Sequence, residues 1–119
     1  MNARQAGSFL RAFGDGTRLR ILSALSQRPL GVSELTQLLR CPLHRVSRHL
    51  RYLHARSVVE YEPRGKGVVY RLTRPEQRLH DEVLRAVLGG LSEVEEVQRD
   101  RAKLGSGTAG ARRGAERGR

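Results

Sequence analysis

The sequence predicts a mainly α-helical domain that carries one small β-hairpin. Apolar residues recur at spacings of three and four along most of the chain, which is the period of an amphipathic helix. Between Val58 and Leu72 this pattern gives way to two short β-prone runs around a turn that contains glycine, which is typical of a hairpin. With 119 residues, the chain has room for one such domain and little more.

The first half of the chain predicts four short helices. Each has an apolar stripe, and the last three also follow a turn or cap signal. The expected ranges are 4–13, 17–26, 34–40 and 43–53, with a turn at 27–31. Asp15 or Thr17 can cap the second helix, on which Arg18 and Arg20 should point outward. Ser33 is a suitable N-cap for the third helix.

The second half predicts the hairpin, one long helix and a tail. Strands at 58–62 and 68–72 should enclose a five-residue turn. A single helix should then run from Pro75 to about Arg101, with Gly89 and Gly90 marking a kink or the close approach of another helix. From Lys103 onward there is almost nothing to bury. We therefore expect a folded domain over 1–102 and a disordered basic tail over 103–119.

The fourth helix has two contrasting faces. At 100° per residue, one arc is apolar and should face the core: Leu43, Val46, Leu50 and Leu53. The opposite arc is basic and has no acid beside it: His44, Arg45, Arg48, Arg51 and Tyr52. Like charges on one helix face repel each other, whereas arginine can donate two hydrogen bonds to guanine O6 and N7 in a major groove. We interpret this face as a DNA-recognition surface.

The distribution of charge supports a nucleic-acid partner. The net charge is +11, although a GC-rich genome alone would raise the arginine content. Position is therefore more informative than number. Glu60 and Glu62 are the only acids between Arg40 and Arg71, whereas acids outnumber bases from 76 to 100. One end of the domain should be basic and another acidic, which favours DNA or RNA as a partner.

The single cysteine and the absence of known catalytic motifs restrict the cellular compartment and the classes of function that we consider. Cys41 is the only cysteine, so an intrachain disulfide is impossible, and the protein should occupy a reducing cytoplasm, associated with the nucleoid if it binds DNA. Cys41 beside a basic helix end could sense oxidants, but a buried structural cysteine is the simpler interpretation. No apolar run is long enough to span a membrane, and no motif predicts an enzyme or a cofactor.

Four stretches of the chain, in this order, resemble the ArsR/SmtB family of small bacterial transcriptional repressors. Residues 14–22 are similar to the family's Asp-Pro-Thr-Arg-Leu-x-Ile-Leu motif, with Gly16 in place of proline. Residues 30–35 stand where the family's metal sensors have Leu-Cys-Val-Cys-Glu-Leu. Residues 46–50 resemble the Val-Ser-x-His-Leu of the recognition helix, and the hairpin resembles the wing.

This resemblance implies a winged helix-turn-helix domain of order α-α-α-α-β-β-α that binds an inverted repeat as a homodimer. The implied base-reading residues are His44, Arg45, Ser47 and Arg48. Contacts to the DNA backbone or minor groove would come from Arg51, Tyr52, Arg64 and Lys66. The first and last helices would form the dimer interface through Phe9, Leu10, Phe13, Leu84, Val87, Leu91 and Val94.

The family's usual metal ligands are missing from the matching positions. Gly31 and Ser33 replace the two cysteines of one site, and Leu91 and Val94 stand where ligands of the other would follow His80. A different interfacial site that combines His80 and Asp81 with two glutamates (Glu93 and Glu96) is less favoured than ordinary surface charge. We therefore expect no metal, and the sequence discloses neither an inducer nor whether one exists. The alternative function is a winged helix that binds RNA or protein without an operator.

Overall fold

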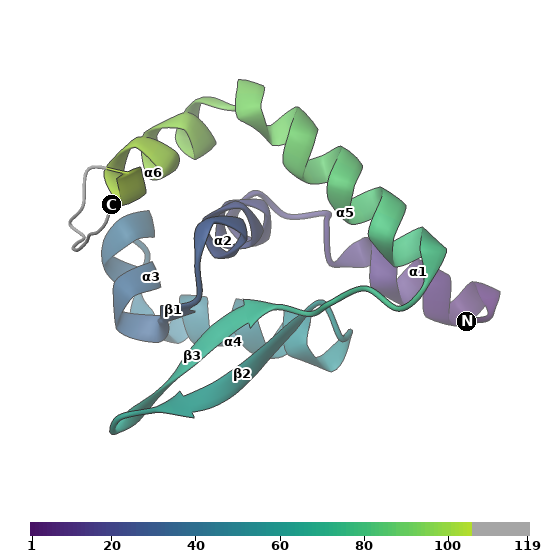
Figure 1. Ribbon diagram of the computed structural model, residues 1–119, viewed down its shortest axis with the longest axis horizontal. Coiled ribbons are helices and arrows are strands. Elements are labelled where there is room, and N and C mark those ends of the chain that lie inside the picture. The colour runs from purple at the N-terminus through teal and green to yellow at the C-terminus, as the bar shows by residue number, and fades with distance from the viewer. Residues whose placement is uncertain (106–119) are drawn as a thin grey trace.

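A computed structural model describes residues 1–105 of the chain. The described elements are α1 (Ala3–Arg11), α2 (Gly16–Gln27), β1 (Leu30–Gly31), α3 (Val32–Leu39), α4 (Leu43–Ala55), β2 (Val59–Arg64), β3 (Gly67–Leu72), α5 (Arg78–Gly90), the 3-10 helix η1 (Leu91–Glu93) and α6 (Glu95–Gly105). Helix α2 lies near the centre, and the β2–β3 hairpin projects from one side (Figure 1). The predicted fold class, mainly helical with a small hairpin, is confirmed.

The core is formed where α2, α3 and α4 meet. Leu22, Leu35 and Leu50, one from each helix, are fully buried, and burying a leucine side chain contributes about 1.5–3 kcal/mol. Of the two residues that could cap α2, Asp15 is the cap, because its side chain accepts a hydrogen bond from the Arg18 amide at 3.0 Å.

The joint between α3 and α4 differs from the prediction in two details. Ser33 is not the N-cap of α3: the helix starts at Val32, and the Glu34 side chain accepts a hydrogen bond from the Gly31 amide at 3.0 Å. Leu43 does not face the core but is 56% exposed. A helical wheel gives only a direction, and Leu43, as the first residue of α4, projects beyond the packed face.

The sheet has three antiparallel strands in the order β1-β3-β2. The predicted turn at 27–31 ends in a short strand, because Leu30 and Gly31 pair with Tyr70 and Val69 of β3. The hairpin is also tighter than predicted: Arg64 pairs with Gly67, which leaves a two-residue turn. Gly65 there has a φ of 60°, a backbone conformation that glycine adopts without a steric penalty.

The prediction of one long C-terminal helix was wrong. Helix α5 ends at Gly90, η1 follows, and Val94 is extended, so that α6 folds back against α2. Two consecutive glycines weaken the helix at this point, and α6 gains a buried ion pair: the Arg20 guanidinium donates two hydrogen bonds to Asp100, at 2.8 and 2.9 Å. Arg20 therefore does not point outward as predicted.

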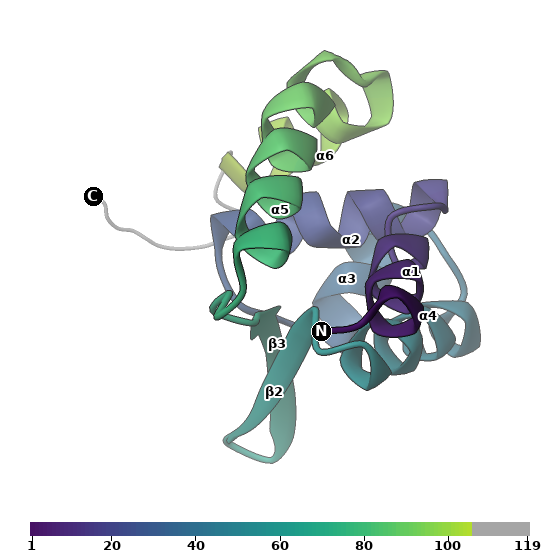
Figure 2. The same ribbon diagram turned by 90° about the vertical axis from the view of Figure 1, so that its right-hand side faces the viewer.

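Helix α4 and the hairpin lie on the same side of the domain, away from α5 and α6 (Figure 2). No helix in residues 1–105 has both the length and the apolar character needed to cross a bilayer. The predicted tail begins inside α6, which continues through 103–105, and the remainder of the tail (106–119) lies outside the described residues.

Candidate nucleic-acid interface

The outer face of α4 presents arginines to solvent. Arg45, Arg48 and Arg51 are exposed, as is His44, and Ser47 is half-buried. None of the three arginine side chains forms an ion pair or a hydrogen bond with another described residue. Their donors are therefore available for a ligand, and no nearby acid neutralises their charge. This face could accept an anion such as a DNA or RNA phosphate, or the edge of a guanine.

The tip of the hairpin adds two more exposed cations, Arg64 and Lys66. The two acids of the hairpin pair with Arg71 instead of with these tip cations. The Arg71 guanidinium lies 2.7 Å from Glu60 and 3.3 Å from Glu62. Among the described residues, Arg64 and Lys66 form no ion pair. The hairpin thus carries its uncompensated positive charge at its tip.

Tyr52 has different surroundings from those predicted. Its ring is half-buried rather than exposed, because two guanidinium groups lie over it: that of Arg56 at 3.4 Å from the ring centroid and that of Arg18 at 4.1 Å. We call Arg18, Tyr52 and Arg56 the Tyr52 clamp. Cations are attracted to the face of an aromatic ring, so the clamp fixes this ring against the body of the domain.

The clamp also connects α4 to α1. Arg18 donates hydrogen bonds to the carbonyls of Ala12 at 3.0 Å and Arg11 at 2.9 Å, and Arg56 donates to the carbonyl of Ser8 at 3.1 Å. The last carbonyls of a helix have no partner within the helix, and cations near its C-terminus are favoured by the helix dipole. The clamp therefore caps α1 while it holds Tyr52. Arg18, like Arg20, does not point outward.

His49 packs on the inner side of α4 and is only 8% exposed. Its Nδ1 lies 3.5 Å from the Arg18 guanidinium, and its Nε2 lies 3.9 Å from the Asp15 carboxylate. Burial lowers the pKa of His49, and the Asp15 charge opposes this effect. His49 therefore belongs to the packing beneath the arginine face rather than to the face itself.

The predicted dimer residues occupy two kinds of position. Phe9, Leu84 and Leu91 are 3%, 7% and 6% exposed, so that they are already buried within the single chain. Phe13 and Val87 are half-buried. Leu10 and Val94 are exposed at 45% and 38%, and Leu79 on α5, which the prediction omitted, is also exposed at 37%.

The residues considered for metal or redox chemistry are dispersed. Gly31 lies in β1, Ser33 is exposed on α3, and Cys41 is buried in the core. His80 packs against Phe9 with ring centroids 4.8 Å apart, and Asp81 forms an ion pair with Arg85. Within residues 1–105 there is no group of three or more potential metal ligands.

Sequence reasoning missed the part that Arg56 plays. One signal was present: Arg56 follows Tyr52 by four residues, a spacing that places two side chains next to each other on a helix. No local signal reveals that Arg18 joins them, because it comes from a different helix. The bonds to α1 carbonyls are likewise a consequence of tertiary packing.

Comparison with known proteins finds similarity to one family of bacterial regulators. Residues 15–61 match the sequence model described as bacterial regulatory protein, arsR family. A transcriptional repressor SmtB homolog from a Synechocystis species is 36% identical over 70 residues, which are 59% of this chain and 53% of the relative. The HTH-type transcriptional repressor SmtB of Mycobacterium tuberculosis is 40% identical over 67 residues, 56% of this chain and 50% of the relative. The chain spans about half the length of these curated relatives, both of which are described as transcriptional repressors.

Solved structures share the fold over most of the chain. HlyU from Vibrio cholerae is 27% identical with a TM-score of 0.63, covering 78% of this chain and 90% of its own. A homodimeric winged helix-turn-helix DNA-binding domain of a possible ArsR-family regulator from Mycobacterium bovis is 23% identical with a TM-score of 0.61, covering 84% and 83%. The fold is thus a winged helix-turn-helix, in which α3 and α4 form the helix-turn-helix and the hairpin is the wing. Residues 15–61 thus resemble the arsR family of bacterial regulatory proteins, and the chain is similar to proteins described as transcriptional repressors.

Proposed function

We propose that the protein is a transcriptional repressor that binds duplex DNA sequence-specifically, as a homodimer on an inverted-repeat operator. The observation that carries this proposal is the outer face of α4, where Arg45, Arg48 and Arg51 are exposed with no acid partner among the described residues. An α-helix fits the major groove of B-DNA, where each base pair presents its own pattern of donors and acceptors.

The position of the wing also supports binding of DNA on the α4 side of the domain. It lies on the same side of the domain as α4 (Figure 2), with Arg64 and Lys66 at its tip. We assign base reading to His44, Arg45, Ser47 and Arg48, and backbone or minor-groove contacts to Arg51, Arg64 and Lys66. Tyr52 positions α4 rather than contacting the DNA, because its ring face is covered by two guanidinium groups.

A homodimer would present two copies of α4 to successive major grooves, as dimeric helix-turn-helix proteins do. Two observations support it. The similar domain from Mycobacterium bovis is described as homodimeric, and α1, α5 and the residue before α6 expose Leu10, Leu79 and Val94. Pairing through these residues would remove apolar surface from water. Phe9, Leu84 and Leu91 would support the interface from beneath.

Release from the operator would not use the family's usual metal sites. Gly31 has no side chain to offer, and Ser33 is a poor substitute for a cysteine thiolate. Leu91 and Val94 cannot bind a metal. Any signal that regulates this repressor would therefore act elsewhere on the chain.

Selection of bound duplexes from a random pool tests the proposed function. We expect an inverted repeat to be enriched and the affinity for it to fall with salt, with a slope near −0.9 per phosphate neutralised in log K against log salt. Lys66→Ala should weaken binding to all sequences alike and reduce that slope by about one phosphate. Glu82→Ala, on the far side of the domain, is the matched control. Binding without sequence preference, or preferential binding of single-stranded RNA, would favour the general interaction module instead.

A further inference from the structure

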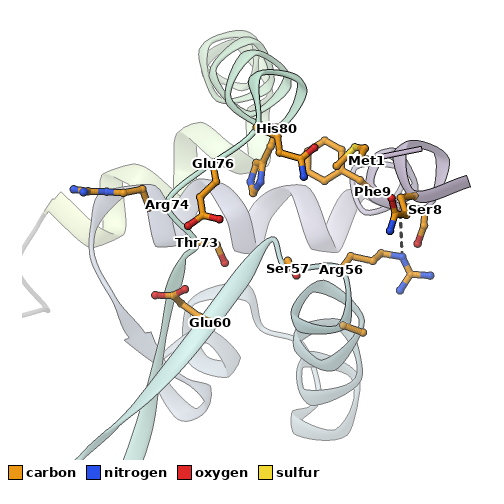
Figure 3. A pocket seen from close by; sticks show the side chains of 13 residues that line it. Met1, Ser8, Phe9, Arg56, Ser57, Glu60, Thr73, Arg74, Glu76 and His80 are labelled. Atoms are coloured by element: carbon orange, nitrogen blue, oxygen red, sulfur yellow. Dashed lines mark hydrogen bonds between the residues drawn. The ribbon is translucent and has the colours of Figure 1, made fainter. Parts of the chain in front are cut away.

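A cavity of about 780 Å³ opens between α1, the start of α5 and the base of the hairpin (Figure 3). Its walls come from segments that are distant in the sequence, including Met1 and Phe9 at the N-terminus, Arg56 after α4, and 73–80 around the start of α5. A volume of this size is typical of sites for small molecules. None of the residues proposed to contact DNA lines it.

Two polar atoms of the cavity wall lack hydrogen-bond partners. Nε2 of His80 and Oγ1 of Thr73 are both buried, and neither has a partner among the described residues. The His80 side chain as a whole is only 7% exposed. Buried polar atoms in folded proteins are nearly always paired, and each exception calls for an explanation. A ligand that meets both atoms, after a rotation of each side chain toward the cavity, would supply the missing partners.

Two arginines and two glutamates line the cavity, and they differ in whether they are paired and where they point. Arg56 is occupied by the carbonyls of Ser8 and Tyr52, at 3.1 and 3.2 Å. Glu60 is paired with Arg71. Figure 3 shows the Arg74 side chain extending away from the cavity and the Glu76 carboxylate turned into it. Glu76 forms no ion pair with the residues that the structure describes.

His80 adds an acceptor rather than a second positive charge. Burial lowers its pKa, and the Asp81 charge only partly opposes this effect. The imidazole is therefore neutral near pH 7, and one ring nitrogen can accept a hydrogen bond. Thr73 offers a hydroxyl oxygen that can also accept. On the other side of the cavity, the Phe9 ring provides an apolar and aromatic surface.

We propose that this cavity binds a small organic cation that carries a primary ammonium group and a compact apolar group. An ammonium has three N–H donors and no acceptor, which matches the Glu76 carboxylate, the Thr73 hydroxyl and the His80 imidazole. The apolar group would lie against Phe9, whose ring face also attracts a cation. A carboxylate ligand of the same shape would be repelled by Glu76.

Occupancy of this cavity also bears on the Tyr52 clamp, and this step rests on the proposed function. The hydrogen bond between Arg56 and the Ser8 carbonyl lies in the cavity wall (Figure 3). Arg56 in turn holds Tyr52 of the recognition helix. A ligand that shifts this wall therefore changes the position of α4 relative to α1. The cavity becomes a site at which an amine regulates DNA binding.

The test titrates the full chain, without DNA, with benzylamine, benzyl alcohol and benzoate, which share one ring and differ in charge. Amide chemical shifts from NMR report binding and its location. We expect benzylamine alone to saturate, with shifts concentrated around Phe9, Thr73 and His80. Glu76→Gln should weaken its binding at least tenfold, and Thr73→Val should weaken it less. Glu82→Gln, which removes an exposed acid from α5 outside the cavity lining, should leave it unchanged.

Failure of any of these expectations overturns the proposal. Absence of benzylamine binding, equal binding of benzoate, or unchanged binding in Glu76→Gln would each do so. A second titration, on the complex with the selected operator, measures regulation. If the protein binds the amine but no operator, the proposed function is wrong and the proposal that the cavity binds an amine is retained. If it binds an operator and no amine, the reverse holds.

Discussion

The arginines around α4 fall into two groups that do different work. The side chains of Arg45, Arg48 and Arg51 are exposed and have no hydrogen-bond or ion-pair partner among the described residues. Arg18 and Arg56 are half-buried, donate to the carbonyls of α1, and lie over the Tyr52 ring. An arginine side chain is thus available to bind a ligand where its N–H donors are free, and it stabilises the fold where those donors are already hydrogen-bonded. Partners, rather than the number of arginines, distinguish the two roles.

The largest effect on stability should come from the arginine whose partner is most deeply buried. Asp100 is 1% exposed and pairs with Arg20, whose side chain is 25% exposed. Asp100→Ala should lower the free energy of unfolding by roughly 3 kcal/mol, because it leaves a partly buried charge without a partner. Chemical denaturation measures this loss. The matched control is Asp81→Ala, which breaks an exposed pair with Arg85 and should change stability by at most about 0.5 kcal/mol.

Substitution of an unpaired arginine on α4 should affect DNA binding but not stability. Arg48→Ala should leave the free energy of unfolding within about 0.5 kcal/mol of the parent protein. In contrast, it should weaken operator binding by about 1–3 kcal/mol for each lost base contact and relax the preference at one position of each half-site. Competition binding with single-base variants of the selected operator provides the measurement. An unchanged base preference would remove Arg48 from the base-reading set.

Substitutions in the Tyr52 clamp should affect both the stability of the domain and its binding to DNA, unlike those at Asp100 or Arg48. Tyr52→Leu should destabilise the domain by about 1–2 kcal/mol, since it removes the ring over which two guanidinium groups lie. If the clamp fixes α4 relative to α1, the variant should also tolerate altered spacing between half-sites. Tyr52→Phe keeps the ring and should retain the spacing preference. A uniform loss of affinity at every spacing would mean that the clamp is only structural.

The smallest expected effect is the dependence of the free energy of unfolding on pH. Burial lowers the pKa values of His49 and His80 in the folded state, below the unfolded value of 6.5. The unfolded chain therefore binds more protons below pH 6.5, so stability is full above that pH and falls as the pH drops toward the folded pKa values. The slope should stay below about 1.4 kcal/mol per pH unit for each histidine. Thermal unfolding between pH 7.5 and 5.5 should show it, and His80→Gln should reduce it.

The sequence by itself determined the local features of this protein. The apolar spacing placed the helices because a helix repeats every 3.6 residues, and the β-prone runs around Gly65 located the wing. The basic arc of α4 could be recognised because neighbours three and four residues apart share a face. The motifs in 14–22, 30–35 and 46–50 revealed the resemblance to the ArsR/SmtB family for the same reason, since each is a short contiguous stretch.

Only the tertiary structure decided which charged side chains remain free. Arg18 and Arg20 appear as exposed as Arg48 in the sequence, yet one caps α1 and the other pairs with Asp100 eighty positions away. The same packing divided the predicted long helix, because α6 folds back to bring Asp100 to α2. Exposed apolar residues and orphaned polar atoms likewise depend on which segments meet in space. Local periodicity sets the direction of a side chain, but long-range packing decides what that side chain meets.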